Sequence, residues 1–109
     1  MLNQVLKTKE EVMNVAVELK QDLMSVLYGS YIVEIEERDE QCNVVLSDKD
    51  NQCKIITMYS MNRMLNVIKM YEQIYEKSID WHIDAKCYLE NDRVRAYPII
   101  EFCIKMVKD

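Results

Sequence analysis

Residues 81–89 read WHIDAKCYL, and apolar and polar side chains alternate along the whole segment. Successive side chains of an extended strand point to opposite faces of a sheet, so this alternation predicts a β-strand with one apolar and one polar face. The apolar set is Trp81, Ile83, Ala85, Cys87 and Leu89; the polar set is His82, Asp84, Lys86 and Tyr88. The polar residues 90–92 predict a turn, after which residues 94–97 return as the second strand of a hairpin.

Two segments have the periodicity of helices. Thr8 and Glu11 have the spacing of a capping box, and apolar residues recur at steps of three and four from Val12 to Val26. Gly29 follows, at a position where a helix often ends with positive φ. A second helix is expected to begin after Ser60 as its N-cap and to close at residues 77–78. Its predicted buried stripe is Met61, Met64, Leu65, Ile68, Tyr71 and Tyr75.

Three further segments, 30–38, 42–46 and 53–59, are predicted to form an antiparallel meander because short apolar runs alternate with polar turns. The segment from Pro98 onward is ambiguous, since proline can begin a helix or interrupt an edge strand. The alternation of Ile100, Phe102 and Ile104 favours a strand, and a C-terminal helix is the alternative. The expected fold is α+β, an antiparallel sheet of about five strands with two helices packed on one face, in the order α-β-β-β-α-β-β.

Composition limits the classes of function. A chain of 109 residues with half of them hydrophobic suits a single domain, residues 1–109, with its own core. The first residues lack a secretory signal, and the apolar runs are too short to span a bilayer. A cytoplasmic protein without a membrane partner is therefore expected. The formal net charge of −5 repels phosphates, so a nucleic-acid partner is not expected.

The sequence offers little that could carry catalysis. His82 shares its strand face with Asp80 and Asp84, which suggests a metal site or an oriented base. Alternate residues on a strand lie roughly 6.5–7 Å apart, however, so one strand supplies two ligands but not three. No glycine-rich phosphate loop or G-x-S-x-G motif is present. We therefore expect no enzymatic activity, no cofactor and no metal.

The four cysteines do not have the spacing of a metal site or a redox motif. Cys42, Cys53, Cys87 and Cys103 each lie among apolar neighbours, which predicts buried reduced thiols. A disulfide between strands is the alternative. Cys87 is on the opposite face of its strand from His82, so a Cys–His nucleophilic pair is not expected.

The best candidate for a binding surface is the polar face of the 81–89 strand and its hairpin partner. Mixed aromatic and charged faces are typical of protein interfaces. A second candidate is the acidic run 34–40, although such a run is more typical of the solvated edge of a sheet. The candidate residues are His82, Asp84, Lys86, Tyr88, Arg95 and Tyr97, with Glu34 and Glu36 from the acidic run.

These features predict a small protein-binding module of the inhibitor, immunity, accessory or adaptor type. One alternative is a small-molecule or nucleotide-binding protein with a pocket between sheet and helices, and with His82, Tyr88 and Arg95 at its mouth. The other is a homodimeric, acidic, chaperone-like protein, joined through a sheet edge or a sheet face. That last alternative depends on the layout alone.

Overall fold

Helix α1 (Lys9–Val26) begins at the predicted capping box. The Glu11 N–H donates to Thr8 Oγ1, and the Thr8 N–H donates to Glu11 Oε1, both at 3.1 Å. The helix buries one stripe, whose members are Val12, Val15, Ala16, Leu19 and Leu23. The computed structural model describes residues 6–27, 31–47 and 58–107, so Gly29 lies outside the described residues.

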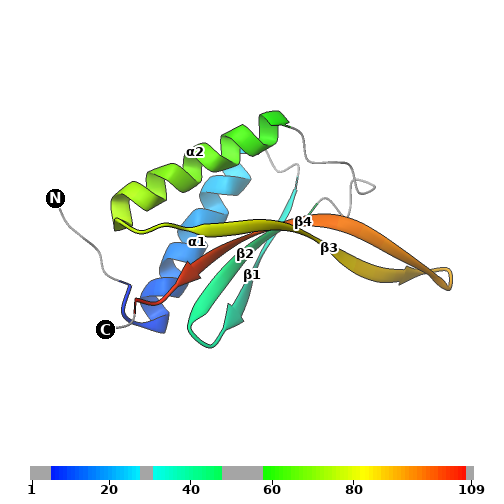
Figure 1. Ribbon diagram of the computed structural model, residues 1–109, viewed down its shortest axis with the longest axis horizontal. Coiled ribbons are helices and arrows are strands. Elements are labelled where there is room, and N and C mark those ends of the chain that lie inside the picture. The colour runs from blue at the N-terminus through cyan, green and yellow to red at the C-terminus, as the bar shows by residue number, and fades with distance from the viewer. Residues whose placement is uncertain (1–5, 28–30, 48–57, 108–109) are drawn as a thin grey trace.

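The described strands form one antiparallel sheet in the spatial order β1-β2-β4-β3 (Figure 1). Strands β1 (Ile32–Arg38) and β2 (Gln41–Ser47) make the first hairpin. Strands β3 (Asp80–Glu90) and β4 (Arg93–Lys105) make the second, and they are joined by a turn at residues 91–92, one residue shorter than the predicted turn 90–92 because Glu90 belongs to β3. Strand β4 inserts between β2 and β3, so the two hairpins meet through β2 and β4.

The predicted third strand at residues 53–59 is not part of the described sheet. Residues 53–57 lie outside the described ranges, and Met58 and Tyr59 belong to helix α2 (Met58–Tyr75). Ser60 is accordingly inside the first turn of α2 and is not its N-cap. A short apolar run fits a strand or a helix equally well. Here helix α2 begins at Met58, earlier than the start that the sequence pattern predicts.

Both helices pack on the same face of the sheet, as predicted. One continuous core joins α1, α2 and the side chains of one sheet face, which we call the helix face. Its fully buried members include Leu19, Leu23, Met64, Val44, Leu46, Ile100 and Phe102. The opposite face, which points away from the helices, is called the open face.

The ambiguous C-terminal segment is a strand. Strand β4 runs through Pro98 without a break, because the proline lies one residue beyond Ile99, the last β4 residue that pairs with β2. Among the described residues Pro98 pairs on the β3 side only, so its missing N–H interrupts no hydrogen bond to β2.

The second hairpin is longer than the sheet that supports it. Beyond Ile99 the pairing of β3 with β4 continues without a third strand from the described ranges, so residues 85–98 form a two-stranded arm (Figure 1). The arm contributes to a longest dimension of 51 Å. Asn91 and Asp92 both have positive φ, 50° and 61°, as a tight two-residue hairpin turn requires.

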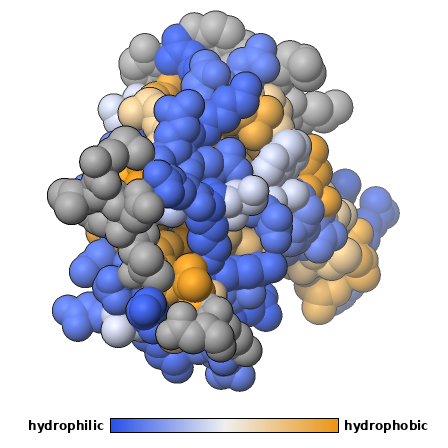
Figure 2. All heavy atoms as spheres, turned by 60° about the vertical axis from the view of Figure 1, so that its left-hand side comes forward, coloured by the Kyte–Doolittle hydropathy of each residue, from blue (hydrophilic) through white to orange (hydrophobic). Residues whose placement is uncertain are grey.

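The helix face of the arm is apolar and exposed. Leu89 and Val94, which pair across the two strands, are 77% and 71% exposed. Hydrophobic side chains gather on the arm where it recedes at the right of Figure 2. The prediction that Cys87 is buried is therefore wrong: this part of the strand extends past the core. Cys42 is buried as predicted, Cys103 is partly buried, all three thiols are free, and Cys53 lies outside the described residues.

Candidate functional site: the open face of the sheet

The eight candidate residues come together on the open face. Register fixes this placement, because residues paired across neighbouring strands share a face. Glu34 aligns through Val45 and Glu101 with His82, so the acidic side chains of β1 lie on the same surface as the polar side chains of β3. The members are Glu34 and Glu36 from β1, His82, Asp84, Lys86 and Tyr88 from β3, and Arg95 and Tyr97 from β4.

An ion pair joins the two outer strands across this face. Lys86 Nζ donates to Glu36 Oε1 at 2.6 Å. In a flat sheet β1 and β3 would lie about 14 Å apart, which is three strand spacings. The sheet must therefore curve so that the arm approaches β1 over the open face. The hydrogen bond from Lys86 lowers the pKa of Glu36, and the same bond raises the pKa of Lys86.

The curvature produces a hollow on the open face. Ile99 and Val45 line it, and Ile99 is only 1% exposed although its side chain lies on the face away from the helices. The hollow has a volume of about 310 Å³. We call it the open-face hollow, and its lining residues are Ile32, Glu34, Val45, Ser47, Lys86, Tyr97 and Ile99.

His82 pairs with a residue that sequence reasoning did not single out. Its Nε2 lies 3.2 Å from Oε2 of Glu101, a buried carboxylate on the neighbouring strand. Asp80 instead pairs with Lys105 at 3.0 Å, and Asp84 accepts a hydrogen bond from the Ala85 N–H. The Asp-x-His-x-Asp pattern therefore does not converge on one point. Among the described residues, no group of three or more His, Cys, Asp or Glu could hold a metal ion.

The aromatic part of the face lies further along the arm. The rings of Tyr88 and Tyr97 are tilted by 57°, and their centroids lie 5.4 Å apart. Arg95 Nε is 3.9 Å from Glu90 Oε2, and the Tyr88 hydroxyl contacts the same carboxylate at 3.5 Å. Of these aromatic and arginine side chains, Tyr97 lines the open-face hollow, whereas Tyr88 and Arg95 extend the surface toward the tip of the arm.

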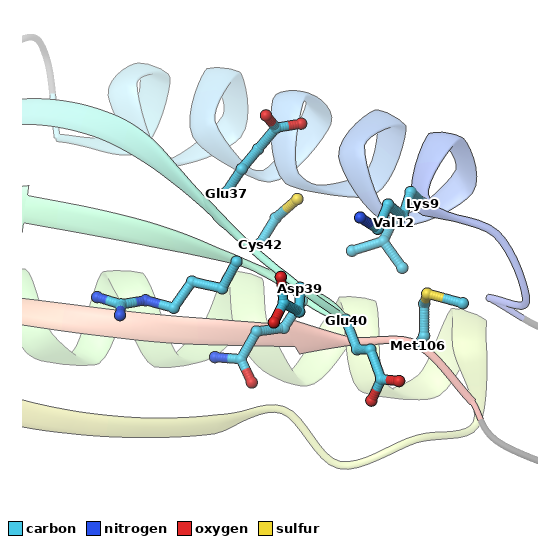
Figure 3. A pocket seen from close by; sticks show the side chains of 9 residues that line it. Lys9, Val12, Glu37, Asp39, Glu40, Cys42 and Met106 are labelled. Atoms are coloured by element: carbon cyan, nitrogen blue, oxygen red, sulfur yellow. The ribbon is translucent and has the colours of Figure 1, made fainter.

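A second pocket lies at the other end of the sheet, beside the turn between β1 and β2. It has a volume of about 230 Å³. Figure 3 shows Cys42 and Glu37 on the sheet, with Lys9 and Val12 on α1 and Met106 beyond the end of β4. Burial, and then the nearby Glu37 carboxylate, raise the pKa of the Cys42 thiol. The thiol is therefore held in its protonated form, which is a poor nucleophile.

Neither helix in the described ranges is both long enough and apolar enough to cross a bilayer. Comparison of the chain with models of protein families, with curated proteins and with solved structures found no match.

Proposed function

We propose that this chain is a non-catalytic protein-binding module whose partner inserts a basic side chain into the open-face hollow. The observation that carries the proposal is the hollow itself, whose lining combines the Glu34 carboxylate and the Tyr97 ring with the aliphatic side chains of Ile32, Val45 and Ile99. The partner is therefore expected to present an arginine or a lysine from an exposed segment.

The lining suits a long basic side chain. The methylene groups would cover Ile32, Val45 and Ile99, and the charged end would reach the carboxylate of Glu34. A guanidinium can also stack on an aromatic ring such as that of Tyr97. Lys86, the cation in the wall, is paired with Glu36, so its charge opposes an incoming cation less than a free ammonium would.

The charge of the whole chain favours the same class of partner. A formal net charge of −5 attracts a basic protein over several ångströms and raises the rate of encounter. In this proposal the hollow determines which side chain is recognised, and the net negative charge of the chain increases the association rate.

A selection from random peptides displayed on phage tests the proposal without a known partner. The wild-type chain is expected to enrich peptides that contain an arginine or a lysine next to an apolar residue. The affinity of an enriched peptide should fall by about tenfold or more with Glu34→Gln, because a charged hydrogen bond is lost. Tyr97→Leu, which keeps apolar area but removes the ring, should weaken binding by a smaller factor.

The matched control is Glu18→Gln, which removes one carboxylate from the exposed side of α1 and leaves the open face intact. It should change affinity only slightly, through net charge. Equal losses for Glu18→Gln and Glu34→Gln would show that the hollow does not recognise the cation. Enrichment of peptides without basic residues would contradict the proposed chemistry.

A small-molecule site in the same hollow is the second candidate. A volume of about 310 Å³ reaches the lower end of the range that ligand pockets occupy. This candidate differs from the predicted pocket between sheet and helices, because the hollow lies on the opposite face. A cationic metabolite that raises the melting temperature of the wild type but not of Glu34→Gln would favour it over a protein partner.

A further inference from the structure

Strand β3 is an outer strand of the sheet, with β4 as its one neighbour among the described residues. The outer edge of such a strand presents N–H and C=O groups that a further strand can pair with. Proteins often protect these edges with prolines or bulges. The eleven residues of β3 contain no proline, and they pair with β4 in continuous register. Within the described ranges no other strand pairs with this edge, so a further strand can approach it; at Ala85 the N–H would have to exchange its hydrogen bond to Asp84 for one to the new strand.

The direction of the backbone groups of β3 follows from Pro98. Proline has no N–H, so the Ala85–Pro98 pair cannot exchange two hydrogen bonds. Bonded and non-bonded pairs alternate along an antiparallel ladder, so the odd-numbered residues 81–89 turn their N–H and C=O groups toward the free edge. The Ala85 N–H agrees with this assignment, because it donates to the Asp84 side chain at 2.8 Å.

One antiparallel register of β3 with a second copy of itself is favoured by charge. With a two-fold axis at Ala85, Asp84 of each copy lies opposite Lys86 of the other. A shift of the axis by one residue would place Asp84 opposite Asp84, or Lys86 opposite Lys86, and like charges directly opposite are destabilising. Ala85 is also the midpoint of Asp80–Glu90, so the favoured register pairs the full strand.

The same register pairs the apolar residues. Ile83 lies opposite Cys87 of the second copy, and Trp81 lies opposite Leu89, the most exposed large apolar residue of the arm at 77%. At the two ends Asp80 lies opposite Glu90. Each of these carboxylates already has a cation of its own chain, Lys105 at 3.0 Å and Arg95 at 3.9 Å respectively.

We infer that the protein forms a symmetric homodimer in which the β3 strands of two copies pair antiparallel about Ala85 and join both sheets into one. Pairing in the plane of the sheet leaves the open face uncovered. The two open-face hollows then lie on the same side of the joined sheet. This inference does not rest on the proposed function, although Lys86 belongs to both surfaces: its side chain lines the hollow and its position fixes the register of the paired edges.

Exchange of charges tests the dimer and its register together. Wild type should sediment with twice the mass of one chain. Asp84→Lys and Lys86→Asp should each be monomeric, because each places two like-charged pairs across the axis. An equimolar mixture of the two variants should form a heterodimer, since every central pair then has opposite charges. Formation of the heterodimer in the mixture would also show that neither variant is simply misfolded.

A proline on the free edge gives a second test. Cys87 turns its N–H outward, so Cys87→Pro should keep the hydrogen bonds to β4 but abolish the dimer, whereas Cys87→Ala should remain dimeric. A wild-type chain that is monomeric at the highest concentration reached would overturn the inference. So would a dimer that is unaffected by both charge reversals. Peptide binding by monomeric Cys87→Pro, which changes no residue that lines the hollow, would leave the proposed function standing without the dimer.

Discussion

Glu76 ends α2 in a conformation that glycine adopts more readily. Its φ is 50°, and the N–H of the following Lys77 donates to the carbonyl of Glu72 at 3.1 Å, which completes the usual C-terminal motif of a helix. A side chain in the left-handed region costs roughly 1–2 kcal/mol, and the greater chain entropy of unfolded glycine offsets part of this. We expect Glu76→Gly to raise the free energy of unfolding by about 0.5–1 kcal/mol, measured by urea denaturation.

The control for this change is Gln73→Gly, which introduces glycine at an exposed position inside the same helix. It should lower the free energy of unfolding by about 1 kcal/mol. If both glycines lower stability to the same extent, the left-handed conformation at residue 76 is not strained in the way we describe.

Glu101 shows where reasoning from single residues fails. It is the only charged residue within the apolar run 98–104, which is the one signal that could have marked it. Its importance depends on a neighbour 19 positions away, His82, which the register of β3 and β4 places opposite it. Local sequence defines the face of a residue on its strand, but pairing between strands defines what the residue meets.

The Glu36–Lys86 ion pair is expected to hold the arm against the body of the sheet. Removing it by Glu36→Gln or Lys86→Met should increase amide hydrogen exchange in residues 85–98, because a two-stranded ribbon is only marginally stable alone. A double-mutant cycle should give a coupling of about 0.5–1 kcal/mol, since both side chains are partly exposed. A coupling near zero would mean that the curvature does not depend on this pair.

The same coupling should depend on pH with a defined sign. The pKa of Glu36 is lowered from 4.5, so its contribution is present above pH 4.5 and is lost as pH falls through the folded-state pKa. The pKa of Lys86 is raised from 10.5, so its contribution is present below pH 10.5 and is lost as pH rises through the folded-state value. Protection of the arm should therefore decrease at acid pH in the wild type and change little in the Glu36→Gln, Lys86→Met double variant.

Elements with local signals could be predicted, and elements that depend on distant pairing could not. The capping box at Thr8 and the alternation of residues 81–89 are contained in a few consecutive residues, and both led to the correct element. The insertion of β4 between β2 and β3 joins segments separated by a whole helix. The hollow is lined by residues of all four strands, which are brought together by this strand order, and that explains why the candidate residues were predicted but their geometry was not.

Burial makes the whole molecule sensitive to alkaline pH. It raises the pKa of the Cys42 and Cys103 thiols from 9.0, and that of the Tyr71 and Tyr75 phenols from 10.0. Each group contributes stability that is complete below its unfolded pKa and is lost as pH rises toward its folded pKa. Stability should therefore fall above pH 9 and more steeply above pH 10, by about 1.4 kcal/mol per pH unit for each proton that only the folded chain retains.

Tyr71 is the group that tests this expectation best, because it is buried between the helices and its hydroxyl donates to Asp22 Oδ2. Tyr71→Phe should lower stability at neutral pH by about 1–2 kcal/mol through loss of that hydrogen bond. Above pH 10 its stability should fall less steeply than that of the wild type, since one titrating group has been removed. The melting temperatures of the wild type and of Tyr71→Phe, measured over a range of pH, should therefore converge as the pH rises above 10.

Asp22→Asn separates the two causes of the shift in Tyr71. Burial is the larger cause, and the Asp22 carboxylate is the next. The variant should therefore keep most of the alkaline decline, although its phenol ionises at a lower pH than in the wild type. If Asp22→Asn removes the decline as completely as Tyr71→Phe does, the charge of Asp22 and not the packing of α1 against α2 controls this tyrosine. If neither variant changes the decline, the loss of stability at high pH arises from the thiols and Tyr75.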